Sequence, residues 1–200
     1  FLSGYEKAIT ALETLDGSIL KQLPQLQVVG KYGVGLDMID LQAMSDLGIK
    51  LGWTAGVNCR GAAELTLSLM IASLRKLTLC QKEIFAGRYQ QIRGRGLTGR
   101  TVGIIGCGHI GKDLVRLLKP FKCKILAYDI VSYDRFYQEN GIEEVELDVL
   151  LNLSDLVTLH VPLDASTKNL IGARELNLMK SDSILMNVAR GGIVDESSLL

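Results

Sequence analysis

Residues 101–129 constrain the fold of this chain more than any other stretch. The short apolar run Thr101–Ile105 predicts a strand, and residues 106–111 (GCGHIG) follow it with the spacing G-x-G-x-x-G. In this pattern the first glycine permits a tight turn, and the second lets the backbone approach a pyrophosphate. The third lets the following helix pack closely on the strand. That helix would point its free N–H groups and the positive end of its dipole at the anion.

A second predicted strand, Lys124–Tyr128, ends in Asp129, 18 positions after Gly111. An acid at this position can accept hydrogen bonds from both ribose hydroxyls of an adenosine, and it repels the 2′-phosphate of NADP. A glycine pattern alone is weak evidence, because glycine-rich turns with a purely structural role are common. The complete order of strand, glycine turn, helix, strand and acid favours a dinucleotide-binding unit.

The first part of the chain predicts a small α/β module of its own. Residues 1–54 alternate short strands with helices, including a helix at 18–23 before Pro24 and another at 41–47 before Gly48. Glycines 33 and 35 could turn backbone N–H groups into a concave nest for a carboxylate or another small anion. An ordinary glycine turn at a strand end is the alternative.

Residues 59–85 predict one long helix. Its middle, residues 65–74 (LTLSLMIASL), is apolar on nearly every face. Such a helix should be buried all round, either between domains or against a second subunit. An internal helix of a monomer is the alternative. A polar connector, residues 87–99, should then lead into the nucleotide-binding unit.

The remainder of the chain continues the alternation. We expect a helix at 133–140, a short apolar and acidic segment at 142–153, a buried strand at 156–162, a helix around 176–179 and a strand at 183–188. Ligands of open parallel sheets bind at the carboxyl ends of the strands. Gly106, Asp129, His160 and Arg190 should therefore line one crevice.

Composition excludes several classes of function. The 22 basic residues balance the 22 acidic ones, so nothing indicates nucleic acid or an anionic membrane as a partner. The four cysteines form neither a C-x-x-C pair nor a metal-binding spacing, which indicates reduced thiols in the cytoplasm and no metal. No signal peptide or membrane-spanning run is visible. Because the chain opens on Phe1 and stops at Leu200 within what looks like a new helix, we expect a fragment of a longer protein.

Five motifs together resemble one family. They are residues 28–37 (VVGKYGVGLD), residues 63–66 (AELT), the glycine pattern with Asp129, residues 159–163 (LHVPL) and residues 187–192 (NVARGG). In this order they resemble the D-isomer-specific 2-hydroxyacid dehydrogenases, which include phosphoglycerate, glycerate and D-lactate dehydrogenases. The resemblance implies an α/β fold. Residues 59–200 would form a Rossmann domain with a doubly wound parallel sheet, truncated at its C-terminal end. Residues 1–58 would form part of a smaller, flavodoxin-like substrate domain.

The resemblance also assigns roles to individual residues. The backbone of Val34 and Gly35 would bind the substrate carboxylate, and Asn58 would be a further substrate-binding residue. Arg190 would be the catalytic arginine, since a planar guanidinium can make two charge-assisted bonds to adjacent oxygens. From the residue alone, an arginine in a surface ion pair is the alternative. The cofactor would be NAD, bound by Thr66, Gly106, Gly108, His109, Ile110, Gly111, Asp129, His160, Pro162, Val188, Ala189 and Arg190.

In function, the chain is identified as an NAD-dependent oxidoreductase of a small 2-hydroxy or 2-oxo acid, similar to phosphoglycerate dehydrogenase and forming a homodimer. The family completes catalysis with a Glu and a His that should lie beyond residue 200, so the fragment alone should be inactive. Neither His109 nor His160 matches that proton donor. The alternative function is an NAD(H)-sensing binding protein, like the transcriptional co-repressors that resemble this family.

Overall fold

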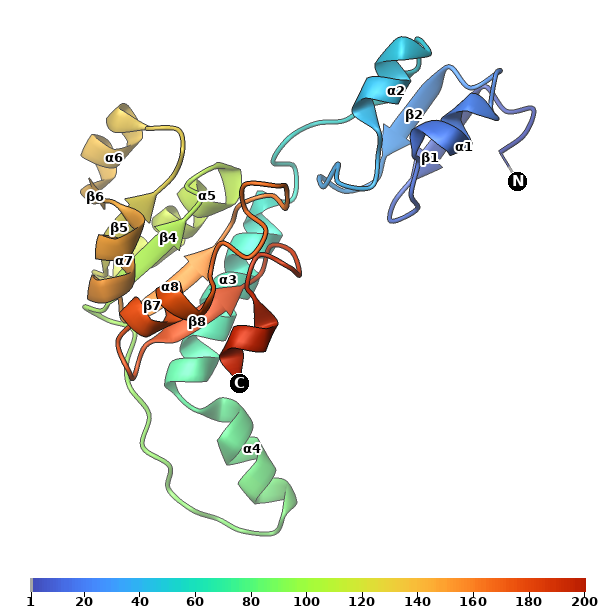
Figure 1. Cartoon of the computed structure of the whole chain (residues 1–200). Coiled ribbons are helices and arrows are strands. Elements are labelled where there is room, and N and C mark those ends of the chain that lie inside the picture. The colour runs from blue at the N-terminus through green and yellow to red at the C-terminus, as the bar shows by residue number, and fades with distance from the viewer. Residues whose placement is uncertain (1) are drawn as a thin grey trace. The chain divides into compact units, whose positions relative to one another are not determined.

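The computed structural model describes residues 2–200 and divides them into two compact units, one ending at Asn58 and one beginning at Cys59 (Figure 1). The first unit has a parallel sheet of three strands in the order β1-β2-β3, with helices between them. Its elements are β1 (Lys7–Thr10), α1 (Gly17–Lys21), β2 (Val28–Lys31), α2 (Leu41–Asp46) and β3 (Lys50–Gly52).

Aspartates begin both helices of the first unit. The Asp16 carboxylate accepts hydrogen bonds from the backbone N–H groups of Ser18 and Ile19, each at 2.9 Å. Asp40 accepts one from Ala43 at 2.9 Å. Such caps satisfy N–H groups that have no partner within the helix. A buried apolar cluster packs these helices and their loops onto one face of the sheet; it consists of Leu15, Leu20, Leu26, Val29, Ile39, Met44 and Ile49.

The second unit is built on a parallel sheet of five strands in the order β6-β5-β4-β7-β8. The strands are β4 (Thr101–Ile105), β5 (Lys124–Tyr128), β6 (Ile142–Glu144), β7 (Leu156–Leu159) and β8 (Ile184–Asn187). The α-helices are α3 (Cys59–Leu74), α4 (Leu77–Phe85), α5 (His109–Leu118), α6 (Asp134–Asn140), α7 (Leu147–Leu153) and α8 (Ala173–Leu178). Two 3₁₀ helices, η1 (Lys119–Phe121) and η2 (Glu196–Leu199), complete it.

The strand order confirms the predicted Rossmann fold. From β4 the chain adds β5 and then β6 on one side, and it returns to add β7 and β8 on the other side of β4. The direction of winding therefore reverses between β4 and β7. In open α/β sheets this reversal leaves a crevice outside the carboxyl ends of the two strands.

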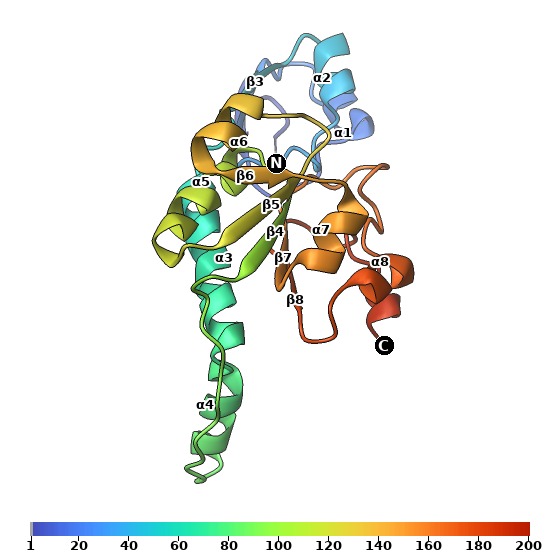
Figure 2. The same cartoon turned by 90° about the vertical axis from the view of Figure 1, so that its left-hand side faces the viewer.

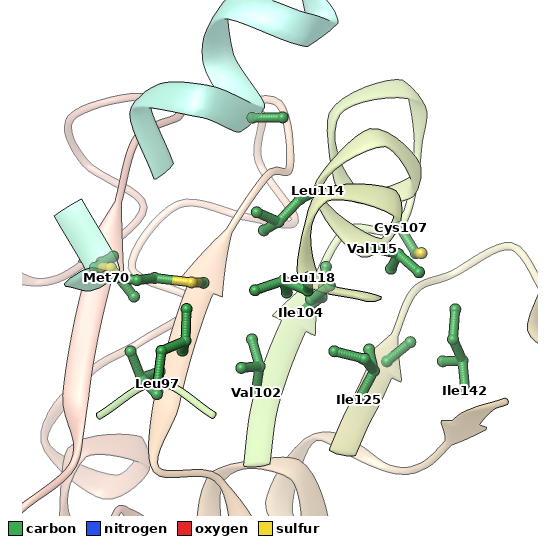
Figure 3. Packing of buried hydrophobic residues seen from close by; sticks show 14 of the residues in the cluster. Met70, Leu97, Val102, Ile104, Cys107, Leu114, Val115, Leu118, Ile125 and Ile142 are labelled. Carbon is green, nitrogen blue, oxygen red and sulfur yellow. The ribbon is translucent and has the colours of Figure 1, made fainter. Parts of the chain in front are cut away.

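Helices cover both faces of the five-stranded sheet (Figure 2). On one face, Val102 and Ile104 of β4 pack against Leu114 and Leu118 of α5 in a cluster that also includes Met70 of α3 (Figure 3). On the other face, Ile105 packs in a second cluster, which includes residues of α7. Alternate residues of β4 thus face opposite layers, as strand geometry requires. This burial on both faces explains the nearly continuous apolar sequence of the strand.

Gly103 lets α7 approach β4 closely. A Cβ at this position would lie 2.4 Å from both Leu150 Cδ2 and Ser154 Oγ, which is far inside van der Waals contact. On the opposite face of the sheet, Arg60 at the start of α3 forms an ion pair with Asp113 of α5. Two N–O contacts of 2.9 Å join the guanidinium to this almost fully buried carboxylate.

The predicted single helix over residues 59–85 is wrong, because the structure has two helices with a break between them. Lys76 adopts a left-handed conformation (φ 54°), and α4 begins after it. The returning connector packs against this break. The Arg95 N–H donates to the Leu74 carbonyl at 2.8 Å, and a Cβ on Gly94 would lie only 2.7 Å from Arg75 Cα.

Within the chain this helix is buried on one face only, so burial of its other face against a second subunit stays a prediction. One face of α3, with Met70 and Leu74, packs into the core, whereas Leu65 and Leu69 are 53% and 38% exposed. Helix α4 has no buried residue, and it projects away from the sheet in both views (Figures 1 and 2).

Smaller differences occur elsewhere in the second unit. The segment at 142–153, to which the sequence assigned no element, contains β6 and α7. Strand β7 ends at Leu159 instead of continuing to residue 162, and the final turn is a 3₁₀ helix capped by Asp195. Among residues 2–200, no helix has both the length and the apolar character needed to cross a bilayer.

Candidate functional site

A cavity of about 430 Å³ lies at the carboxyl ends of β4, β5 and β7, where the winding of the sheet reverses. Its position matches the crevice in which doubly wound sheets bind their ligands. It is lined by Ile105, Gly106, Gly108, Tyr128, Asp129, Ile130, Val131, Tyr133, His160, Val161, Pro162, Asp164, Ser166, Thr167 and Leu170.

The glycine turn borders this cavity, and two of its positions require glycine for steric reasons. Gly106 has φ +90°, and a Cβ there would lie 2.8 Å from the backbone carbon and oxygen of His160. A Cβ on Gly111 would lie 2.6 Å from the Gly106 carbonyl oxygen. Only glycine fits these two positions, because one needs a left-handed backbone and both are crowded by other backbone.

Gly108 differs from its neighbours because the space beside it is open. A Cβ at this position would meet no protein atom within 4 Å. Gly108 is also the N-cap of the ten-residue helix α5, and no side chain caps that helix. The first N–H groups of a helix have no partner within it. An uncapped helix start beside open space fits a pyrophosphate, which would accept those hydrogen bonds at the positive end of the helix dipole.

Asp129 connects the end of β5 to the glycine turn. Its Oδ2 accepts a hydrogen bond from the Cys107 N–H at 2.7 Å, and its Oδ1 accepts one from the Val131 N–H at 3.1 Å. A carboxylate has about four acceptor positions, so these two bonds leave capacity for the hydroxyls of a ribose. The residues of this cavity therefore fit NAD: they offer an acid for the ribose and open helix N–H groups for the pyrophosphate.

His160 lines the cavity as a neutral side chain. Burial lowers the pKa of its imidazole to about 4, because the charged form would lose its hydration. Its Nε2 lies 3.1 Å from the Thr158 hydroxyl oxygen, and its buried Nδ1 has no hydrogen-bond partner among residues 2–200. At neutral pH the His160 imidazole is therefore uncharged and is a poor proton donor.

Only some of the sequence-predicted cofactor residues line this cavity. Gly106, Gly108, Asp129, His160 and Pro162 do so. His109, Ile110 and Gly111 form the first turn of α5, next to the cavity floor. Thr66 is fully buried in α3, where its hydroxyl donates to the Ala62 carbonyl at 2.8 Å.

Val188, Ala189 and Arg190 follow β8 and are not among the residues that line this cavity, so it brings together Gly106, Asp129 and His160 of the predicted crevice, and the place of Arg190 in that crevice stays a prediction. The turn that holds it is ordered by Asn187. The Asn187 amide donates to the Arg190 carbonyl at 2.7 Å, and its side-chain oxygen accepts from the Ala189 N–H at 3.1 Å. The Arg190 guanidinium donates to the Ala189 carbonyl at 2.9 Å.

Sequence reasoning missed the apolar wall of the cavity, which includes Tyr128, Ile130, Val131, Tyr133 and Leu170. The Lys112 ammonium lies 3.3 Å from the ring centre of Tyr133, a cation–π contact that fixes the ring at the cavity edge. The residues after β5 carry a local signal, since they follow the acid directly. Leu170 carries none, because only the fold brings it close.

The first unit has a cavity of its own, of about 540 Å³, at the carboxyl ends of β2 and β3. Gly33 has φ +96°, as the predicted nest requires, whereas Gly35 is not in the left-handed region. Of the predicted substrate residues, Asn58 lines the cavity; Val34 and Gly35 do not, but the Val34 carbonyl accepts a hydrogen bond from the Trp53 indole at 3.1 Å. The lining consists of Lys31, Tyr32, Gly33, Gly52, Trp53, Thr54, Val57 and Asn58.

Metal and redox sites find no support in the part of the chain that the structure describes. It contains no group of three or more His, Cys, Asp or Glu side chains that could hold a metal ion. All four cysteines are free thiols. Burial raises the pKa of the Cys107 thiol in the glycine turn to about 11, so this thiol stays protonated and unreactive at neutral pH.

Comparison with known proteins agrees with this geometry. Residues 67–200 match the family model described as "D-isomer specific 2-hydroxyacid dehydrogenase, NAD binding domain". The chain belongs to the D-isomer-specific 2-hydroxyacid dehydrogenases. Its second unit is thus the NAD-binding domain of this family, and its cofactor is NAD.

Individual relatives of this dehydrogenase family carry different names. The chain is 34% identical to a glyoxylate reductase of Thermococcus litoralis, over 97% of the chain and 63% of that protein. It is 35% identical to a D-3-phosphoglycerate dehydrogenase of Archaeoglobus fulgidus, over 98% of the chain and 38% of that protein. The chain therefore spans less than two thirds of either relative.

A solved structure supports the fold. The D-lactate dehydrogenase of Aquifex aeolicus, complexed with NAD and lactic acid, matches with a TM-score of 0.91 and 29% identity. The match covers 99% of this chain and 60% of that one.

The open space at Gly108 gives a test of the cofactor site. Gly108→Ala should weaken NADH binding by about tenfold or more, because the added Cβ would enter the space beside the helix start. It should lower the free energy of unfolding by only about 1 kcal/mol, the cost of a poorer N-cap. Fluorescence titration with NADH and urea unfolding followed by circular dichroism measure the two effects.

Gly96→Ala is the matched control, since a Cβ there also meets no atom within 4 Å but lies outside the cavity. Unchanged NADH affinity in Gly108→Ala, with the protein folded, would show that the pyrophosphate does not occupy this space.

Proposed function

We propose that the whole protein is an NAD-dependent D-2-hydroxyacid dehydrogenase that interconverts a small 2-hydroxy acid and its 2-oxo acid, with an activity similar to that of phosphoglycerate dehydrogenase. One observation carries the proposal: the cavity at the sheet reversal joins an open helix start to the Asp129 carboxylate, within a unit that matches the family's NAD-binding domain. The names of the relatives support the substrate class, since they include glyoxylate reductase and hydroxypyruvate reductase.

In this proposal the second unit holds the cofactor. Asp129 accepts hydrogen bonds from the adenosine ribose, while the N–H groups of the turn from Gly108 to Gly111 bind the pyrophosphate. Val131 and Leu170 of the apolar wall, together with Pro162, receive the adenine. Contacts from Thr66, His160, Val188 and Ala189 follow from the resemblance to the family. When bound, NAD supplies the hydride chemistry between its nicotinamide and C2 of the acid.

The substrate would be held by groups from two parts of the sequence. We assign the backbone of Val34 and Gly35 to the substrate carboxylate, and Asn58 to substrate binding. Arg190 would bind that carboxylate and polarise the adjacent 2-oxo group, because its planar guanidinium can address two neighbouring oxygens at once. The turn ordered by Asn187 restricts the backbone that carries it. The protein would thus hold the substrate in place and supply the positive charge beside its 2-oxo group.

A proton for the developing alkoxide is the remaining requirement, and we assign it to neither histidine of the sequence. His160 is neutral at physiological pH, since its pKa lies at about 4. His109 is an exposed residue on the first turn of α5. The proposal therefore places the proton donor outside these two side chains, in agreement with the resemblance.

Arg190 provides the direct test of this function. In the full-length protein, Arg190→Ala should lower kcat for 2-oxo acid reduction about 100-fold or more, because a charge that stabilises the transition state is lost. Arg190→Lys should recover little, since an ammonium cannot make the two-pronged contact. NADH oxidation against a panel of 2-oxo acids measures both, with Arg135→Ala as control, because Arg135 is an exposed surface residue.

Each outcome has a clear meaning. Wild-type activity in Arg190→Ala would remove this residue from catalysis. A wild-type protein that binds NADH but reduces none of the acids would contradict the enzyme and favour an NAD(H)-sensing binding protein.

We also propose that the protein is a homodimer that uses the exposed apolar face of α3 and α4. Besides Leu65 and Leu69, this face has Leu77, Ile84 and Phe85, which are 52%, 61% and 80% exposed. Apolar side chains grouped on neighbouring helices are typical of surfaces that contact another protein. Met70 and Leu74 are unsuitable for testing this interface, because they are buried in the core of their own unit.

Leu69→Asp combined with Ile84→Asp should therefore convert the dimer to a folded monomer, because a charge is costly in an apolar interface. Sedimentation velocity at micromolar concentration measures the change. Gln138→Asp, at an exposed residue of α6 outside this face, should leave the dimer intact. A wild-type protein that sediments as a monomer would contradict the proposal.

We propose the cytoplasm as the location. Four free thiols among the described residues suit a reducing compartment.

A further inference from the structure

Trp53 is the first residue after β3, and its side chain reaches the loop that follows β2. The two strands are neighbours in the sheet, and Gly30 pairs with Gly52 near their ends. The indole Nε1–H of Trp53 donates a hydrogen bond to the Val34 carbonyl at 3.1 Å. Trp53 also lines the cavity of the first unit. One side chain thus connects the loop after β3 to the loop after β2.

The Val34 carbonyl belongs to the same peptide group as the Gly35 N–H. This peptide is trans, so its C=O and N–H point in opposite directions. The indole therefore holds one end of the peptide and leaves the other end open. Among residues 2–200, the N–H groups of Val34 and Gly35 donate to no backbone acceptor. The peptide that Trp53 holds thus carries an unused donor, the Gly35 N–H assigned above to the substrate carboxylate.

This peptide needs an external restraint because glycine follows it. Gly35 has no Cβ, so its backbone permits rotation of the peptide that joins it to Val34. A rotated peptide would turn its carbonyl oxygen toward the carboxylate and repel it. The indole bond opposes that rotation. It also polarises the peptide, and such coupling strengthens the next hydrogen bond in a chain by about 10 to 30%.

We propose that Trp53 is a positioning residue for the substrate: its indole fixes the peptide between Val34 and Gly35 so that the Gly35 N–H meets the substrate carboxylate. The inference rests on the function proposed above and adds a residue that lies outside the glycine loop. The indole N–H is the group that acts, since it is the only hydrogen-bonding group of a tryptophan side chain.

Two tryptophan analogues, placed at position 53 of the full-length protein, separate the N–H from the ring. Benzothienylalanine has a sulfur in place of the N–H and nearly the same shape. It should raise KM for the 2-oxo acid about 3- to 10-fold, because one orienting hydrogen bond is lost. The kcat should change less than about twofold, and NADH affinity should stay the same, because the second unit binds the cofactor. Fluorotryptophan keeps the N–H and should behave like the wild type.

Oxamate, an unreactive analogue of a 2-oxo acid, gives a second measurement. Its inhibition constant should rise by the same factor in the benzothienylalanine variant and in Trp53→Phe, because its carboxylate uses the same N–H. Gln22→Met is the matched control. Gln22 is an exposed residue of the same unit, and its side chain donates to the Ser18 carbonyl at 3.2 Å, outside the cavity. Loss of this bond should leave KM and oxamate inhibition unchanged.

Three results would overturn the inference. Wild-type KM and oxamate inhibition in the benzothienylalanine variant would show that the N–H does not position the peptide, while the dehydrogenase function stands. Equal losses with both analogues would show that the ring acts through packing, again with the function intact. No turnover of any 2-oxo acid by the wild type would overturn the proposed function and this inference together.

Discussion

The fold and the candidate site of the second unit both depend on the turn that follows β4. At this point two backbone hydrogen bonds fix the strand end from both sides: the Gly106 N–H donates to the Tyr128 carbonyl at 2.9 Å, and the His160 N–H donates to the Ile105 carbonyl at 2.8 Å. The turn must then pass over the His160 backbone with no side chain at Gly106. The Asp129 carboxylate completes the restraint by binding the next N–H of the turn.

This restraint connects packing to function. Because β4 is buried between two helical layers, its end is positioned by the core on both faces. Helix α5 starts directly after this turn, and its uncapped N–H groups face open space. A loop with free ends could not hold these donors in register for a ligand. The sheet and its two layers therefore define the site, and the residues of the turn supply only its chemistry.

The sequence predicted the parts of this unit that have strong local signals. The order of strand, glycine turn, helix and acid requires residues only a few positions apart, so the fold and the cofactor could be inferred from residues 101–129. The break at Lys76 was not predictable in the same way, because it is stabilised by the connector around Gly94 and Arg95, far along the chain. Strand β6 has only three residues, too few for a periodic pattern.

The candidate sites show the same division. Asp129 and Gly108 were identified because their roles follow from spacing, whereas Leu170 reaches the cavity only through the folded chain. Arg190 was assigned to the shared crevice because it follows a strand of the same sheet. However, β8 is the edge strand two positions from β4, and its end lies outside the cavity lining. The order of the strands, which the sequence does not give directly, explains why Arg190 is absent from the lining of this cavity.

Asp129 should make the cavity beside β4 select NAD over NADP, and calorimetric titration of the protein with each cofactor measures this selectivity. NAD should bind about tenfold more tightly or better, because the 2′-phosphate of NADP would meet the carboxylate as a like charge, and Asp129→Ala should narrow that difference. Equal affinities of the wild-type protein for NAD and NADP would contradict this role of Asp129.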